Sequence, residues 1–118
     1  MAKCIKDNRS SIGGTSYCGV IVARESEIRA WLGEPGEGDG YKVSLKWRGR
    51  VIEDETTDLA GRVFTLYDWK ETNLYDEDLL TPAHLHELNF PREWHIGGFD
   101  KKTADLVKQA FAEWEDTK

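Results

Sequence analysis

The sequence is poor in the residues that cross-link or break a chain. Its 118 residues include two cysteines, one methionine and three prolines. Two thiols, Cys4 and Cys18, do not make the disulfide framework of a small secreted domain, although they could pair across a hairpin. We expect both to be reduced thiols of a cytoplasmic protein.

Long apolar runs are also missing. No stretch approaches the roughly 20 apolar residues that a membrane-spanning helix needs. The N-terminal stretch MAKCIKDNRSS lacks the apolar core of a signal peptide. We therefore expect no membrane partner.

Basic residues are outnumbered. Lysine and arginine total 16 against 22 acidic residues, which gives a net charge of −6. Non-specific binding to nucleic acid needs a basic surface, so we expect no direct nucleic-acid binding. The same balance permits a basic protein partner, or mimicry of nucleic acid by carboxylates, and it equally suits an ordinary solvated surface.

Signatures of catalysis and of bound cofactors are missing as well. There is no GxSxG nucleophile elbow, and the glycines of 36–40 lack the strand and helix that flank a phosphate-binding loop. His84 and His86 have the spacing of a metal pair on a strand, but their segment predicts loop or helix, and no third ligand follows at standard spacing. We expect no metal, no cofactor and a non-enzyme, with a small hydrolase that uses His95 left open.

What the sequence has is a clear order of strands and helices. The strongest strand pattern is RVFTLYDWK at Arg62–Lys70, which is apolar on both faces and therefore expected in the centre of a sheet. Alternation predicts further strands over 17–23, 41–47 and 94–96, with a turn or bulge at 48–50 and an extension over 51–52.

Three helix starts are also indicated. Ser26 is expected to cap a short helix that ends at Gly33, and Thr81 with Pro82 to open a helical turn. Asp100 or Thr103 is expected to cap a final helix. Its buried stripe is predicted to be Ala104, Val107, Ala110, Phe111 and Trp114.

Together these elements predict one α+β domain over residues 1–118. The predicted architecture is a two-layer sandwich: an antiparallel sheet of about four strands, with the short N-terminal helix and the long C-terminal helix packed on one face. Residues 1–16 are expected to form a flexible arm or one ragged strand. Residues 71–92 are expected to form a long loop.

Aromatic and charged side chains gather on three strands that are predicted to be neighbours. Aromatic faces, cations and a glycine turn suit an anionic, nucleotide-like small molecule, because rings stack on a base and backbone N–H groups approach closely. The predicted ligand-binding residues are Lys42, Trp47, Tyr67, Asp68, Trp69, Lys70, Trp94, His95, Gly97 and Gly98, with Lys46 in the same group. The same residues equally suit cross-strand core pairs and solvated strand lysines.

Several of these stretches, taken in order, resemble a known family. They are LGEP at 32–35, GDGYK at 38–42, Trp47, YDWK at 67–70 and WHIGG at 94–98. The set resembles a family of small uncharacterised proteins of bacteriophages and large DNA viruses, with the pattern FGEP, GD-K, W, IYDYK or IYDWK, and WHIGG before a final helix. The resemblance covers roughly residues 26–114. The sequence departs from the pattern at Leu32, where an aromatic residue is usual, and in its long acidic 71–92 segment.

The resemblance implies a viral accessory protein that counters host defence by binding, in the host cytoplasm. The first hypothesis is sequestration of a nucleotide-like signalling ligand by the aromatic and cationic residues. The second is an acidic inhibitor that blocks a basic, nucleic-acid-binding host effector, and the third is the small hydrolase that uses His95. The sequence names neither ligand nor host target, and it leaves open whether the chain forms a homo-oligomer.

Overall fold

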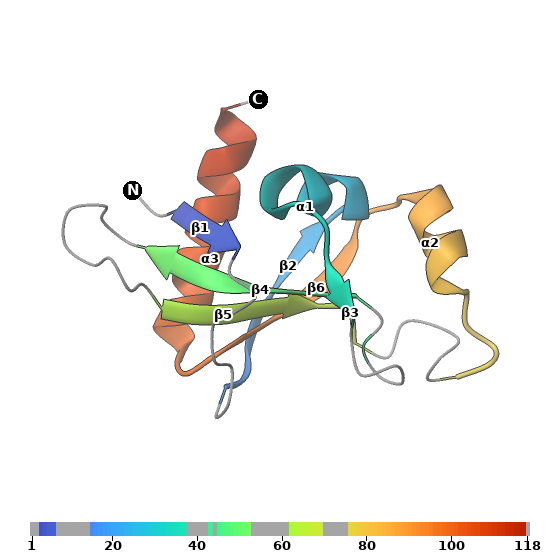
Figure 1. The fold of residues 1–118 in the computed structure, drawn as a ribbon, viewed down its shortest axis with the longest axis horizontal. Helices are drawn as coiled ribbons and strands as arrows, with labels where there is room; N and C mark the ends of the chain where they lie inside the picture. Colours follow the sequence, from blue (N-terminus) through green and yellow to red (C-terminus); the bar gives the residue numbers. More distant parts are fainter. Residues whose placement is uncertain are drawn as a thin grey trace.

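Strands from both halves of the chain form one antiparallel sheet in the computed structural model, which describes residues 3–6, 15–37, 43, 45–52, 62–69 and 76–117 (Figure 1). The order across the sheet is β1 (Lys3–Lys6), β4 (Leu45–Ile52), β5 (Arg62–Tyr67), β6 (Arg92–Gly98) and β2 (Ser16–Ala23). The short β3 (Gly36–Glu37) also pairs with β4. The predicted α+β fold is confirmed, and β1 and β3 widen the expected sheet.

The centre of the sheet is where the sequence places it. β5 lies between β4 and β6, as its apolar pattern on both faces predicts. The strand ends at Tyr67, earlier than the predicted Lys70, which lies outside the described residues. The expected N-terminal arm contains a strand, because β1 pairs with the second half of β4.

β4 corrects the predicted hairpin strand. The sequence predicted a strand over 41–47 and a turn or bulge at Arg48–Arg50, whereas β4 runs from Leu45 to Ile52 without a break in its register with β5. Trp47, Gly49 and Val51 are all buried, so the alternation continues through a glycine that has no side chain to reveal it. Residues 41, 42 and 44 lie outside the described part of the chain.

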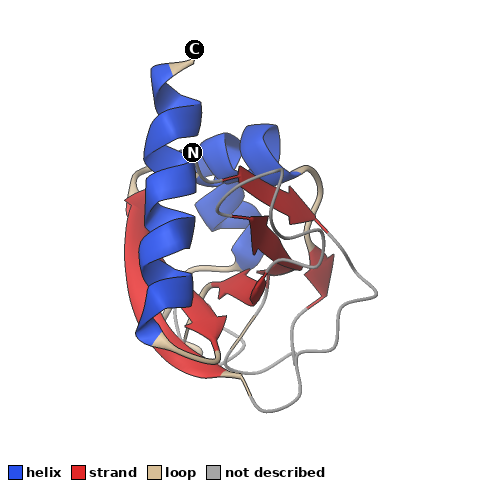
Figure 2. Ribbon diagram, turned by 90° about the vertical axis from the view of Figure 1, so that its left-hand side faces the viewer, coloured by secondary structure: helices blue, strands red, loops and turns tan. Residues whose placement is uncertain are grey.

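Two helices cover one face of this sheet, α1 (Glu25–Leu32) and α3 (Lys101–Asp116) (Figure 2). Arg24, rather than the predicted Ser26, is the N-cap of α1. Gly33 ends α1 as predicted, with a φ of 86° that glycine adopts readily. Asp100 caps α3, where its carboxylate accepts a hydrogen bond from the Thr103 backbone N–H at 3.0 Å.

The segment predicted as a long loop contains a helix, α2 (Pro82–Leu88). The Thr81 hydroxyl accepts from the His84 backbone N–H at 3.1 Å, and Pro82 stands at the first helical position, as predicted. Asn89 ends α2 with a left-handed φ of 46°, and its side-chain oxygen accepts from the Ser26 backbone N–H at 3.1 Å. This hydrogen bond joins the end of α2 to the start of α1. Of the predicted loop, the described residues before α2 are 76–80, which form a turn.

The core lies between the sheet and the pair α1 and α3. Its fully buried side chains include Ile28, Trp47, Val51, Phe64, Leu66, Trp94, Ile96 and Val107. The predicted stripe of α3 is buried except for Trp114, which is half-buried and stacks on Phe111 with ring centroids 5.9 Å apart. None of the helices in the described ranges is long and apolar enough to cross a membrane.

The two cysteines stay separate. Cys4 on β1 and Cys18 on β2 are both free thiols, on strands at opposite ends of the sheet order. Burial raises the pKa of each thiol above its ordinary value. The alternative of a disulfide across a hairpin is therefore wrong for this structure, and both side chains pack against the core instead.

Candidate ligand-binding site

Strand alternation divides the predicted site residues between the two faces of the sheet. On β6, Trp94 and Ile96 are fully buried in the core, and a side chain at Gly98 would meet Thr103 of α3. His95 and Gly97 point to the other side, which we call the distal face because it lies away from α1 and α3. The motif WHIGG therefore contributes to both faces.

Trp47 and Trp94 belong to the core rather than to the predicted site. Their exposed fractions are 1% and 0%, and their rings meet edge to face with centroids 5.4 Å apart. Each indole N–H is already bonded, from Trp47 to the Gly33 carbonyl at 2.8 Å and from Trp94 to the Ala23 carbonyl at 3.0 Å. A buried indole with its donor satisfied offers a ligand no surface, so these two side chains pack on each other in the core, from the two strands that flank β5.

Asp68 is also buried, at the end of β5. Its carboxylate accepts from the Leu45 backbone N–H at 3.0 Å and lies 3.8 Å from the guanidinium of Arg92. Arg92 in turn lies over the Trp94 ring, 4.3 Å from its centroid. The structure therefore joins Asp68 to the core and to the start of β4, away from the distal face.

A buried carboxylate that sequence reasoning did not single out, Glu25, has three neighbours with side-chain nitrogens, two arginines and a histidine. It is 1% exposed, and it accepts from Arg29 at 2.8 Å, from Arg92 at 3.3 Å and from the ring of His86. Burial alone would raise the pKa of Glu25, but the hydrogen bonds from His86 and Arg29 and their charges outweigh it and lower that pKa. A carboxylate held ionised in this way is a weak general base at neutral pH, so it links α1, α2 and β6 rather than serving catalysis.

Four rings gather on the distal face. His95 lies 4.8 Å from Tyr17, 5.7 Å from Tyr67 and 6.2 Å from Trp69, measured between ring centroids, and its ring is within 24° of parallel to that of Trp69. Tyr67 and Trp69 meet edge to face at 6.0 Å. Burial lowers the pKa of His95, partly opposed by Glu93, so the imidazole is neutral at neutral pH.

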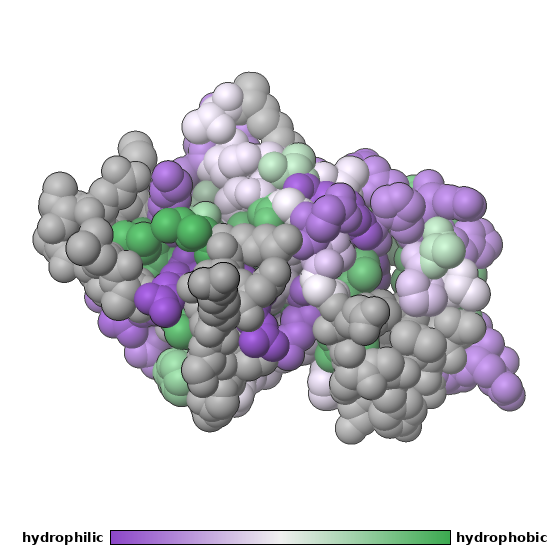
Figure 3. Space-filling model, in the orientation of Figure 1, coloured by the Kyte–Doolittle hydropathy of each residue, from purple (hydrophilic) through white to green (hydrophobic). Residues whose placement is uncertain are grey.

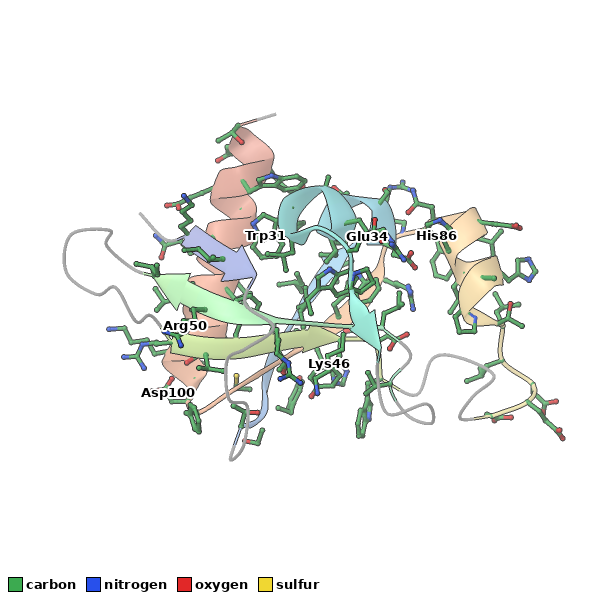
Figure 4. The ribbon with its side chains drawn as sticks, viewed as in Figure 1. Trp31, Glu34, Lys46, Arg50, His86 and Asp100 are labelled. Atoms are coloured by element: carbon green, nitrogen blue, oxygen red, sulfur yellow. The ribbon has the colours of Figure 1, made fainter. Side chains whose placement is uncertain are left out.

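A pocket of about 190 Å³ opens beside this cluster. Tyr67 and Trp69 supply its aromatic wall, and Lys46 stands directly across the β4–β5 ladder from Tyr67. Figure 4 shows Lys46 on the side of the sheet away from α1. The remaining lining residues are Thr15, Ser16, Val43, Thr65 and Gly97.

The structure thus brings Tyr67, Trp69, His95 and Gly97 together and adds two residues that sequence reasoning missed. Tyr17 and Thr65 enter because β2 pairs with β6 and Gly97 lies directly opposite Thr65. A strand over 17–23 was predicted, but no local signal names its neighbour. Lys42 and Lys70 lie outside the described residues, so their place in the site stays a prediction.

The aromatic side chains, the lysine and the polar residues around this pocket are groups that can contact a ligand. Among the described residues, no group of three histidines, cysteines or acids is placed to hold a metal ion, and the neighbours of His95 are rings. The Cys18 thiol donates to the Ile96 carbonyl at 3.5 Å rather than to a base. No protein-family model matches the sequence, and no curated protein matches it significantly.

Proposed function

We propose that this chain binds a small anionic ligand with a planar ring, of the nucleotide class, on the distal face of its sheet. The observation that supports this most is the pocket itself. Tyr67 and Trp69 border it, Lys46 contributes the only lysine or arginine among its described lining residues, and Thr15, Ser16 and Thr65 line the same space.

Each part of the pocket matches one part of such a ligand. A base stacked on an aromatic side chain gains about 1–3 kcal/mol, and the gain depends little on which base it is. A lysine ammonium attracts a phosphate as a point charge, and hydroxyls donate to the remaining oxygens. Drug-sized ligands occupy roughly 300–1,000 Å³. The 190 Å³ pocket is smaller, which favours one ring system over a pair of stacked bases.

The arrangement favours retention of the ligand over its conversion. Nucleophilic catalysis needs a serine or cysteine within hydrogen-bond distance of a base. His95 instead packs among Tyr17, Tyr67 and Trp69, and burial lowers its pKa. The resemblance to phage and large-virus proteins supplies the setting: we propose that the ligand is a host defence signal that the protein sequesters.

Isothermal titration calorimetry with adenosine, guanosine, cytidine and uridine monophosphates tests the site directly. We expect Trp69→Ala to weaken binding about tenfold or more because it removes a stacking surface. Lys46→Ala should cost about tenfold through the lost charge-assisted contact. Mass spectrometry of whatever heat releases from the purified protein identifies a ligand carried from the cell.

Matched controls separate binding from folding. Phe90→Ala removes a 41%-exposed aromatic residue, and Lys108→Ala removes an exposed lysine of α3, and neither residue lines the pocket. Both controls should bind like wild type, and all four variants should be compared in thermal melts. If Trp69→Ala and Lys46→Ala keep wild-type affinity for every ligand that the protein binds, the distal pocket is not the site.

A second candidate, the acidic inhibitor, rests on the other end of the molecule. Asp76, Glu77, Asp78 and Glu87 are all exposed at or near α2, and Figure 3 shows that end as largely hydrophilic on the face drawn. A basic host partner would bind there with an affinity that falls as salt rises. Reversal of 76–78 to lysine should abolish capture of that partner if this candidate is right and leave nucleotide titrations unchanged. The acidic residues at 53–55 lie outside the described part of the chain.

A further inference from the structure

Among the described residues, β2 forms an edge of the sheet with little to protect it. Its eight residues, SYCGVIVA, contain no charged residue and no proline, and within the described strands β2 pairs with β6 alone. Natural sheets protect long edges with lysine, proline, bulges or a covering segment, because unpaired N–H and C=O groups attract another strand. One bulge, between Tyr17 and Gly19, is the single such feature along this strand.

Two large apolar side chains of β2 are exposed. Tyr17 is 56% exposed and Val22 is 61% exposed, and both lie on the distal face. Tyr17, Val20 and Val22 stand opposite Gly97, His95 and Glu93 of β6. Because these three partners alternate regularly along β6, the bulge leaves Val20 midway between the two exposed side chains.

We propose that β2 pairs antiparallel with β2 of a second copy of this chain, about a two-fold axis at Val20. In that register Tyr17 lies opposite Val22 of the partner subunit, and the reciprocal pair forms across the axis. Cross-strand pairs of an aromatic and a β-branched residue stabilise a sheet. A two-fold pairing therefore covers both exposed side chains of each copy at once, which selects a second copy over an unrelated strand.

Charge and size set the strength of this association. The net charge of −6 opposes association of two copies in general, but β2 itself is uncharged. The α3 residues that act electrostatically on Cys18 of β2 include Asp105 and Lys108, which have opposite charges. A strand of eight residues spans about 26 Å. One strand pair buries less than the roughly 1,600 Å² of a standard interface, so the dimer is a weak, concentration-dependent one.

The second copy also extends the distal face. Tyr17 packs on His95 with ring centroids 4.8 Å apart, so Val22 of the partner subunit borders the aromatic cluster. The pairing continues the sheet through both copies and places both distal faces on one side. This inference rests on the edge strand alone and does not require the proposed ligand.

Sedimentation velocity of the ligand-free protein, from about 1 µM to about 1 mM, tests the pairing. Wild type should shift from monomer to dimer across this range. Val22→Lys should weaken association at least tenfold while leaving the melting temperature of dilute protein unchanged, because the side chain is exposed. Leu88→Lys, at a 52%-exposed position on α2, is the matched control and should dimerise like wild type.

A mixing experiment tests the register. Tyr17→Lys and Val22→Glu should each associate poorly alone. An equimolar mixture should form a heterodimer at least tenfold more tightly, because the ammonium introduced in one copy then faces the carboxylate introduced in the other. A wild type that stays monomeric throughout, or a Val22→Lys variant that dimerises normally, overturns the proposal. If the equimolar mixture associates no more tightly than either variant alone, the two-fold axis at Val20 is wrong.

Discussion

Gly97→Ala is a small change with a large expected cost. A Cβ built on Gly97 lies 2.3 Å from the hydroxyl oxygen of Thr65, far inside van der Waals contact, and 3.5 Å from the Tyr67 ring. Thr65 is 4% exposed in the central strand and pairs directly with Gly97. Because its side chain is β-branched, χ1 is restricted, and one of the two other χ1 rotamers only replaces the hydroxyl by the methyl group in the same space.

The clash therefore has to be relieved by movement of β5 against β6 or by a change of χ1 at the buried Thr65. Overpacking of this kind costs typically about 1–3 kcal/mol. At about 4 °C per kcal/mol for a chain of this length, the melting temperature should fall by about 4–12 °C. Gly36→Ala is the matched control, since its nearest neighbour is the Lys46 carbonyl at an ordinary 3.5 Å. That variant should melt at or slightly above the wild-type temperature.

Thr65→Ala decides whether the clash is the cause. Alone it should destabilise by loss of packing, but in combination with Gly97→Ala it frees the space that the new methyl group needs. The double variant should be at least about 1 kcal/mol more stable than the sum of the single changes predicts. Urea unfolding of the four proteins gives this cycle. A Gly97→Ala protein that melts like wild type, or an additive cycle, would refute the packing argument.

Two further predictions concern buried polar groups. Because the folded-state pKa of Glu25 is lowered, its carboxylate contributes stability above about pH 4.3, its ordinary value, and loses it as pH falls through the folded pKa. Glu25→Gln should therefore be less stable than wild type at pH 7 by a margin that narrows toward pH 3, measured by urea midpoints; a constant margin would contradict this. Trp47→Phe removes the donor to the Gly33 carbonyl and should cost about 1–3 kcal/mol, more than Trp31→Phe at a half-buried position. Equal losses for the two tryptophans would show that the hydrogen bond adds nothing.

The sequence predicted the helix ends and starts that depend on nearby residues. Gly33, Pro82 and Asp100 each stand where the sequence puts a helix end or start, because capping depends on neighbours within one turn. The centre of the sheet followed from a strand that is apolar on both faces. The predicted cap at Ser26 was wrong because the Glu27 side chain accepts a hydrogen bond from the Arg24 backbone N–H, and the helix therefore begins two residues closer to the N-terminus.

Contacts between residues far apart in the sequence could not be predicted, because no pattern of neighbouring residues specifies them. Glu25 contacts His86 and Arg92, which follow it by more than sixty residues in the sequence. The only part of this cluster that is visible locally is the i,i+4 pair of Glu25 and Arg29. The pairing of β2 with β6 brings Tyr17 to His95, and nothing in either strand alone specifies it. The candidate site was therefore predicted in Tyr67, Trp69, His95 and Gly97, and it was missed in Tyr17 of β2 and in Thr65, which faces Gly97 across the β5–β6 ladder.

Strand alternation explains why one short motif can serve folding and binding together. In YDWK, Tyr67 and Trp69 face the distal side, while Asp68 turns inward to Leu45 and Arg92. In WHIGG, Trp94 packs edge to face on Trp47, whereas His95 joins the distal rings. The distal rings do not contribute to the core, so substitutions on the two sets should have different effects. Substitutions of the inward side chains should change the free energy of unfolding, and substitutions of the distal rings should change the affinity for a ligand.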